Sequence, residues 1–115
     1  MKKFRAPQPL KRANDPPRYM AAAGVSWYAT ERDWAEVKAT AEDADRFEPT
    51  YAEWVTMVEE GMVKMLQAGI FSEKVLVTAG ELLVWCRLTG KANNGGNRAL
   101  FVSEKLRNKL EADIN

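Results

Sequence analysis

The side chains that most often carry out catalysis are scarce in this sequence. It contains no histidine, the commonest general base and metal ligand, and a single cysteine, Cys86. Cys86 lies in the most apolar stretch of the chain, where a thiol behaves as a small hydrophobic group. An internal disulfide, a zinc site of cysteines and histidines, and a histidine-activated nucleophile are all excluded by count. We therefore expect no catalytic residue, no metal ligand and no cofactor.

Paired carboxylates are the remaining candidates for acid–base chemistry. Asp33 with Glu36, and Glu59 with Glu60, are close enough in sequence to act together. Both pairs are predicted on the solvated faces of helices, where the pKa of a carboxyl group has little cause to shift. A third acidic run, residues 42–45, lacks the glycine and the spacing of a calcium-binding loop. An acidic surface is the better interpretation of all three.

Residues 90–97, GKANNGGN, contain part of a phosphate-binding pattern. Gly90 and Gly95 have the spacing of the two glycines of such a loop, but Gly96 and Asn97 follow where lysine and serine or threonine are required. The backbone amides of residues 95–97 can still hold an anion at the start of a helix. The alternative is a plain, mobile turn, because asparagine and glycine favour positive φ angles.

The net charge of +1 conceals three blocks of opposite sign. Residues 1–30 carry a net charge of +5, residues 31–60 carry −7, and residues 61–115 carry +3. Such blocks are typical of surfaces used in association. The candidate contacts to an anion or a nucleic acid are the basic residues of the first and third blocks: Lys2, Lys3, Arg5, Lys11, Arg12, Lys91, Arg98, Lys105 and Lys109.

Residues 1–18 contain four prolines and six basic side chains. Prolines lack an amide donor and disfavour helix, so we expect an extended, flexible arm that precedes a single domain over residues 19–115. Three roles remain open for the arm: a solvated tail, a segment that binds a nucleic acid or a protein partner, or a strap over the chain's own acidic helix.

Four segments of the sequence predict helices. The clearest covers residues 50–69, where Thr50 and Glu53 form a capping box and Gly69 provides a left-handed C-terminal cap. A second begins at Thr30 and continues to Phe47, and a third covers residues 79–89 with its own capping box. The fourth covers residues 98–113.

The helix predicted over residues 79–89 is apolar on almost its whole circumference. A helix of this kind is buried, or it meets a second surface in an oligomer. We expect it to be the central partner of the helix over residues 50–69. The candidate protein-interaction surface combines this helix with the acidic one and consists of Glu36, Glu42, Asp43, Trp85 and Leu88.

Residues 75–77 have strand character but are too few to be stable alone. Their partner is expected to be the segment 25–28 or a second copy of the chain. The preceding residues 21–23 are alanines, which favour helix. The predicted fold is therefore a mainly α, compact bundle of three to four helices, with one short strand or hairpin as a minor α+β feature.

These observations predict a small, non-enzymatic interaction or regulatory protein that binds another protein, which the sequence does not identify. Self-association as a homodimer is left open. The alternative is a nucleic-acid-associated accessory protein that contacts phosphates through the basic arm and the basic ridge of the last helix. An enzyme that works through carboxylates is the least supported class. With no signal peptide and no apolar run of membrane-spanning length, the expected location is the cytoplasm.

Overall fold

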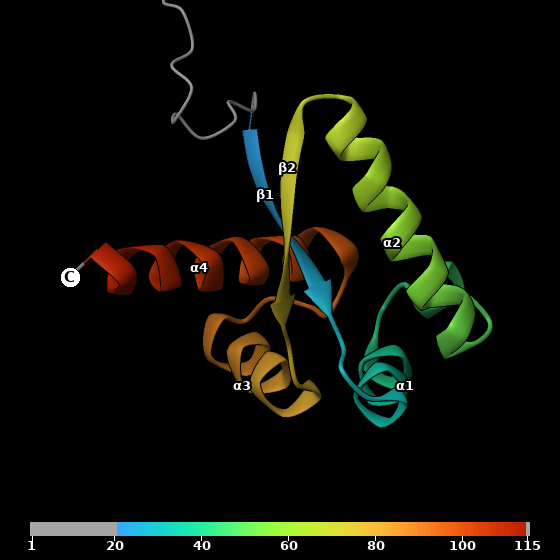
Figure 1. Cartoon of the computed structure of the whole chain (residues 1–115). Helices are drawn as coiled ribbons and strands as arrows, with labels where there is room; N and C mark the ends of the chain where they lie inside the picture. Colours follow the sequence, from blue (N-terminus) through green and yellow to red (C-terminus); the bar gives the residue numbers. More distant parts are fainter. Residues whose placement is uncertain (1–20, 115) are drawn as a thin grey trace, which may run out of the picture.

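A computed structural model describes residues 21–114 of the chain. The predicted basic arm, residues 1–18, lies outside these residues. The elements follow in the order β1 Ala21–Trp27, α1 Glu31–Thr40, the 3₁₀ turn η1 Ala44–Arg46, α2 Tyr51–Gln67, β2 Ile70–Leu76, α3 Ala79–Thr89 and α4 Gly95–Ile114 (Figure 1). This order confirms a mainly α fold with a minor β component.

The two strands form a parallel pair at the centre of the structure. Their register runs from Ala21 opposite Ile70 to Trp27 opposite Leu76. Parallel strands need a long crossover, which α1, η1 and α2 provide here. Of the two partners expected for residues 75–77, the segment 25–28 is the one that pairs in the structure, but β2 begins earlier and β1 includes the alanines at 21–23. Because the pair is parallel, the hairpin alternative is wrong. Cross-strand pairing therefore overrides the helical preference of alanine.

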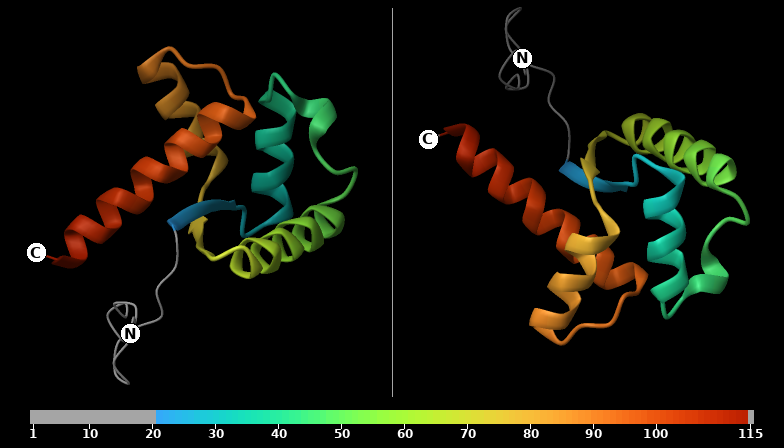
Figure 2. Two further views of the ribbon diagram at one scale, coloured as in Figure 1. Left: turned by 90° about the horizontal axis from the view of Figure 1, so that it is seen from above. Right: turned by 90° about the horizontal axis from the view of Figure 1, so that it is seen from below.

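The sheet lies between two helices (Figures 1 and 2). Gly24 faces α4, because a Cβ atom placed on it would lie 2.7 Å from Cγ1 of Val102. The neighbouring pair, Val25 and Lys74, faces the other way, and Lys74 reaches Glu59 of α2 at 3.0 Å. The helices α2 and α4 therefore cover opposite faces of a two-stranded sheet.

The expected central pairing of α2 with α3 is wrong. The helix α2 packs mainly along β2 and also on α1, whereas α3 packs on α1 and α4. Only Ala79 and Leu82 of α3 are buried, while Val84 and Leu88 are 46% and 80% exposed. The sheet, which fills the centre of the fold, leaves α3 at the periphery with one apolar side open.

Three threonines begin the first three helices as predicted. The side chains of Thr30, Thr50 and Thr78 accept the amides of residues 33, 53 and 81, respectively. The capping box is complete at Thr78, where the Glu81 carboxylate accepts the Thr78 amide. At Thr50 the Glu53 carboxylate instead accepts the threonine hydroxyl. The predicted left-handed cap, Gly69, has a positive φ angle of 86°, and so does Gly90 at the end of α3, at 72°.

The helix α1 ends at Thr40, earlier than the predicted end near Phe47. The cause is a tertiary contact: the Asn93 side chain donates to the carbonyl oxygen of Val37 at 3.0 Å, and the Glu42 amide donates to the Asn93 carbonyl at 2.8 Å. These bonds satisfy groups that a longer helix would have paired internally. Within residues 21–114, no helix is long and apolar enough to cross a membrane.

Candidate interaction groove

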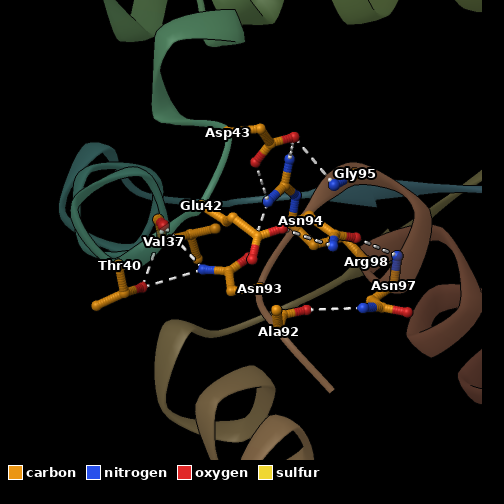
Figure 3. A network of polar contacts seen from close by, with 10 residues as sticks. All are labelled: Val37, Thr40, Glu42, Asp43, Ala92, Asn93, Asn94, Gly95, Asn97 and Arg98. Atoms are coloured by element: carbon orange, nitrogen blue, oxygen red, sulfur yellow. Dashed lines mark hydrogen bonds and ion pairs between the residues drawn. The ribbon is translucent and has the colours of Figure 1, made fainter.

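Of the turn predicted over residues 91–97, residues 91–94 form an anchored loop, and residues 95–97 are already the first turn of α4 (Figure 3). Asn93 is 6% exposed, and its side-chain nitrogen binds both the Val37 carbonyl and the Thr40 hydroxyl at 3.0 Å. Asn94 caps α4 by accepting the Asn97 amide at 3.0 Å. The polar groups of this loop are extensively paired, so it is more than the plain turn that its composition predicts.

The candidate anion position at the start of α4 is occupied by the protein's own carboxylate. Asp43 accepts the Gly95 amide at 3.0 Å and binds Arg98 through two bonds, from Nη1 to Oδ1 at 3.0 Å and from Nη2 to Oδ2 at 2.9 Å (Figure 3). The hydrogen bond from Arg98 is the main cause that lowers the pKa of Asp43 below its ordinary value. Asp43 therefore has an internal structural contact, although the sequence placed it on an interaction surface.

The predicted basic ridge of α4 is paired with carboxylates along its length. Lys105 binds Glu81 at 2.8 Å, Lys109 binds Glu73, and Arg98 binds Asp43. Of the other candidate contacts, Lys91 is exposed, and Lys2, Lys3, Arg5, Lys11 and Arg12 lie outside the described residues. The ridge thus offers less free positive charge to a phosphate backbone than the sequence indicated.

The predicted protein-interaction residues do not form one surface. Glu42 accepts a hydrogen bond from Asn94 in the loop before α4, and Asp43 accepts one from Gly95 at the start of α4. Trp85 packs on Phe101 and donates to Glu104 at 3.1 Å. Glu36 pairs with Arg32 on the outside of α1. Leu88 is the one member of the set that presents a large apolar side chain to solvent.

A feature that the sequence did not indicate is the free edge of β1. The Val77 amide donates to the Trp27 carbonyl at 2.9 Å, with Trp27 opposite Leu76 in the register. In a parallel ladder this bond means that both the amide and the carbonyl of Trp27 point toward β2. Along the strand, residues whose backbone groups point toward β2 alternate with residues whose backbone groups point away from it. The backbone groups of Val25 therefore point into the sheet, while those of Gly24 and Ser26 point away from it.

Lysine side chains of α4 cover the opposite edge of the sheet, along β2. The same alternation directs the Leu76 carbonyl outward, and Lys105 donates to it at 2.6 Å. Lys109 lies farther along the same helix and binds Glu73 of β2. Lysine side chains over a strand edge discourage pairing with other chains. Among the described residues, no hydrogen bond reaches the outward amides and carbonyls of Gly24 and Ser26, so the two edges differ.

The free edge of β1 lies at the floor of a groove with a volume of about 340 Å³. One wall is α2, which contributes Trp54, Met57, Val58, Gly61 and Met65. The other wall is the start of α4, with Gly95, Arg98 and Ala99, and residues 46–48 close one end. The groove combines unpaired backbone groups with an apolar wall, and its parts come from four separate segments of the chain.

The charge around the groove is mildly negative. Three acidic residues, at positions 48, 53 and 60, lie on the end segment and on the adjoining face of α2. They outnumber the two basic residues there, Arg46 and Lys64. Arg98 lines the groove, but its charge is compensated by Asp43. Tyr28 also lines it, and burial raises the pKa of its hydroxyl group. No cluster of three or more potential metal ligands occurs within residues 21–114.

The chemistry available in the groove is recognition by backbone hydrogen bonds and apolar contact. The sequence contained one signal for it, Gly61 in the interior of a helix, where a glycine is unfavourable and no internal contact requires it. Gly24, the glycine inside β1, is instead explained by the close packing of Val102 of α4. Comparisons of the chain with protein-family models, with curated proteins and with solved structures found no match.

Proposed function

We propose that the protein is a small, non-enzymatic interaction module that accepts an extended segment of another protein as a third strand beside β1. The observation that carries this proposal is the position of Gly24 and Ser26, whose outward backbone groups have no hydrogen-bond partner among residues 21–114 and lie in a groove between α2 and α4.

Strand addition suits this groove because the backbone supplies the affinity and the walls supply the specificity. Two outward amides and two outward carbonyls can form up to four hydrogen bonds with an added strand, each with a net contribution of about 0.5–1.5 kcal/mol. Side chains of the added strand would alternate between the apolar wall of α2 and the small residues Gly95 and Ala99 of α4.

A small-molecule site is less well supported by the same groove. Its volume is at the lower end of the range for such sites, and these usually contain a few convergent polar side chains. Here Arg98 is already held by Asp43. Binding of a nucleic acid, the alternative from the sequence, is also less well supported, because Arg98, Lys105 and Lys109 each face a carboxylate.

The test is a selection of displayed random peptides of about ten residues, the length of a long strand, on the immobilised full chain. Two variants accompany the wild type. Ser26→Pro removes an outward amide on the groove side, and Ser72→Pro removes an outward amide on the β2 edge, so each keeps the ladder between the strands. Ser72→Pro is therefore a matched control.

We expect the wild type and Ser72→Pro to enrich the same peptides and Ser26→Pro to lose them. The proposal is wrong if the wild type enriches nothing, or if both proline variants bind the enriched peptides as the wild type does. A concentration-dependent dimer that Ser26→Pro abolishes, with no peptide enriched, would mean that a second copy of the chain occupies the edge.

A further inference from the structure

Gly61 lies in the middle of α2, and nothing within the fold accounts for a glycine there. A Cβ atom placed on it meets no described atom within 4 Å. Glycine in a helix interior is about 0.8–1.0 kcal/mol less favourable than alanine, so the position weakens α2 without relieving any internal contact. Gly61 does, however, line the groove, with Met57 and Met65 one turn away on either side.

We infer that Gly61 opens a hollow between Met57 and Met65 that receives one large apolar side chain of the added strand. This inference rests on the proposed function and names its ligand: an extended protein segment with one leucine, methionine or aromatic residue, flanked by basic residues. Gly61 is then the position that determines the specificity of the groove.

The alternation of the sheet assigns the side chain that enters the hollow. Val25 faces α2, because its partner Lys74 reaches Glu59 there and its neighbour Trp27 contacts Trp54 with ring centroids 5.2 Å apart. A residue of the added strand that lies opposite Val25 points to the same side of the sheet. It therefore points toward the wall that contains Gly61.

The chemistry of the hollow favours a large apolar group. Methionine side chains are unbranched and polarizable, so they adapt to an inserted leucine or aromatic ring. Met57 is 43% exposed without an added strand, so burying its side chain would add to the free energy of binding. The three acidic side chains at positions 48, 53 and 60 outnumber the basic Arg46 and Lys64 around the hollow, so the net charge there is negative. This charge complements basic residues on either side of the apolar one.

The substitution Gly61→Leu tests the inference because it fills the hollow with the protein's own side chain. Gly80→Leu is the control: Gly80 lies in α3, away from the groove, and it also has no described atom within 4 Å of an added Cβ. Both variants replace a helical glycine by a good helix former, so both are expected to fold. Circular dichroism and thermal unfolding verify this before binding is measured.

We expect peptides enriched by the wild type to share one large apolar position, and their dissociation constants to rise about 10- to 100-fold with Gly61→Leu, as for the loss of a buried side chain. A new selection on Gly61→Leu should replace that position by glycine, alanine or serine. Gly80→Leu should bind as the wild type does.

The inference is wrong if Gly61→Leu binds the wild-type peptides with unchanged affinity, or if the large apolar position persists in the new selection. Loss of binding with Ser26→Pro in the same experiments would still support the proposed function. If the wild type enriches no peptide, the proposed function itself fails, and the inference fails with it. A dimer that Gly61→Leu dissociates would assign the hollow to a second copy and would also contradict the inference.

Discussion

Asp43 and Arg98 are 55 residues apart in the sequence and form a bidentate ion pair at the start of α4. Their side chains are 21% and 13% exposed, so the pair is shielded from water on most sides. Asn93 accepts a further bond from Arg98 at 2.8 Å. The pair ties η1 to the N-terminal end of α4 and thereby fixes the distance between one end of the groove and one of its walls.

Replacing Asp43 by asparagine is predicted to lower the free energy of unfolding by about 2–3 kcal/mol, because a shielded guanidinium loses its charged partner. Urea unfolding at neutral pH measures the change. Asp45→Asn, which neutralises an exposed carboxylate two residues away, is the control and should have an effect within about 0.5 kcal/mol. Equal effects of the two substitutions would contradict the structural role of the pair.

The difference between wild type and Asp43→Asn should also depend on pH. The pKa of Asp43 is lowered in the folded protein, so its ionised form is favoured by folding. The stabilisation is therefore present in full above the unfolded pKa, ordinarily 3.8, and is lost as the pH falls through the lowered folded value. Urea midpoints of both proteins, measured between neutral and strongly acidic pH, should converge on acidification. A difference that stays constant would assign the effect to something other than the carboxylate charge.

Gly24→Ala is predicted to destabilise the protein by about 1–3 kcal/mol, as overpacking does. The added Cβ would lie 2.7 Å from the Val102 side chain and 3.2 Å from that of Val75. Gly61→Ala is expected to have the opposite effect and to raise the free energy of unfolding by up to about 1 kcal/mol, because its site is open and helical. Thermal unfolding of both variants measures the contrast, and a stabilising Gly24→Ala would contradict the close packing of α4 on β1.

Proline substitutions along β1 should have alternating effects. Val25→Pro removes an amide that points into the ladder and is predicted to cost about 3 kcal/mol or more. Ser26→Pro removes an outward amide and should cost about 1 kcal/mol, chiefly through the lost hydrogen bond between the serine hydroxyl and the Tyr28 side chain. Chemical denaturation of the two variants gives the comparison. Similar losses at both positions would mean that the backbone of β1 is oriented differently.

Local signals in the sequence predicted the helices well, because their causes are local. Thr50 and Thr78 begin helices through bonds to residues three positions away, and Gly90 ends one through its own backbone angle. The sheet was predicted only in part. Its pairing depends on contacts between Ala21–Trp27 and Ile70–Leu76, and the alanines of β1 have no local preference for a strand.

The groove could not be predicted because no single segment contains it. It depends on which way the backbone of Gly24 and Ser26 points, and that direction is set by the register with β2. In the same way, the sequence could not indicate that Asp43 and Arg98 neutralise each other, so both were assigned to surfaces for partners. Pairings between residues that are 24 to 55 positions apart decide which charges of α4 remain free.

The central claim, that β1 presents a free edge to a partner strand, is tested most directly by amide hydrogen exchange on the full chain, followed by NMR. In the free protein, the amides of Gly24 and Ser26 should exchange rapidly, while those of Val25 and Trp27 are protected by the ladder. Addition of a peptide enriched in the selection should protect Gly24 and Ser26 as well. Protection of Gly24 and Ser26 already in the free protein, or rapid exchange that the peptide leaves unchanged, would contradict the account.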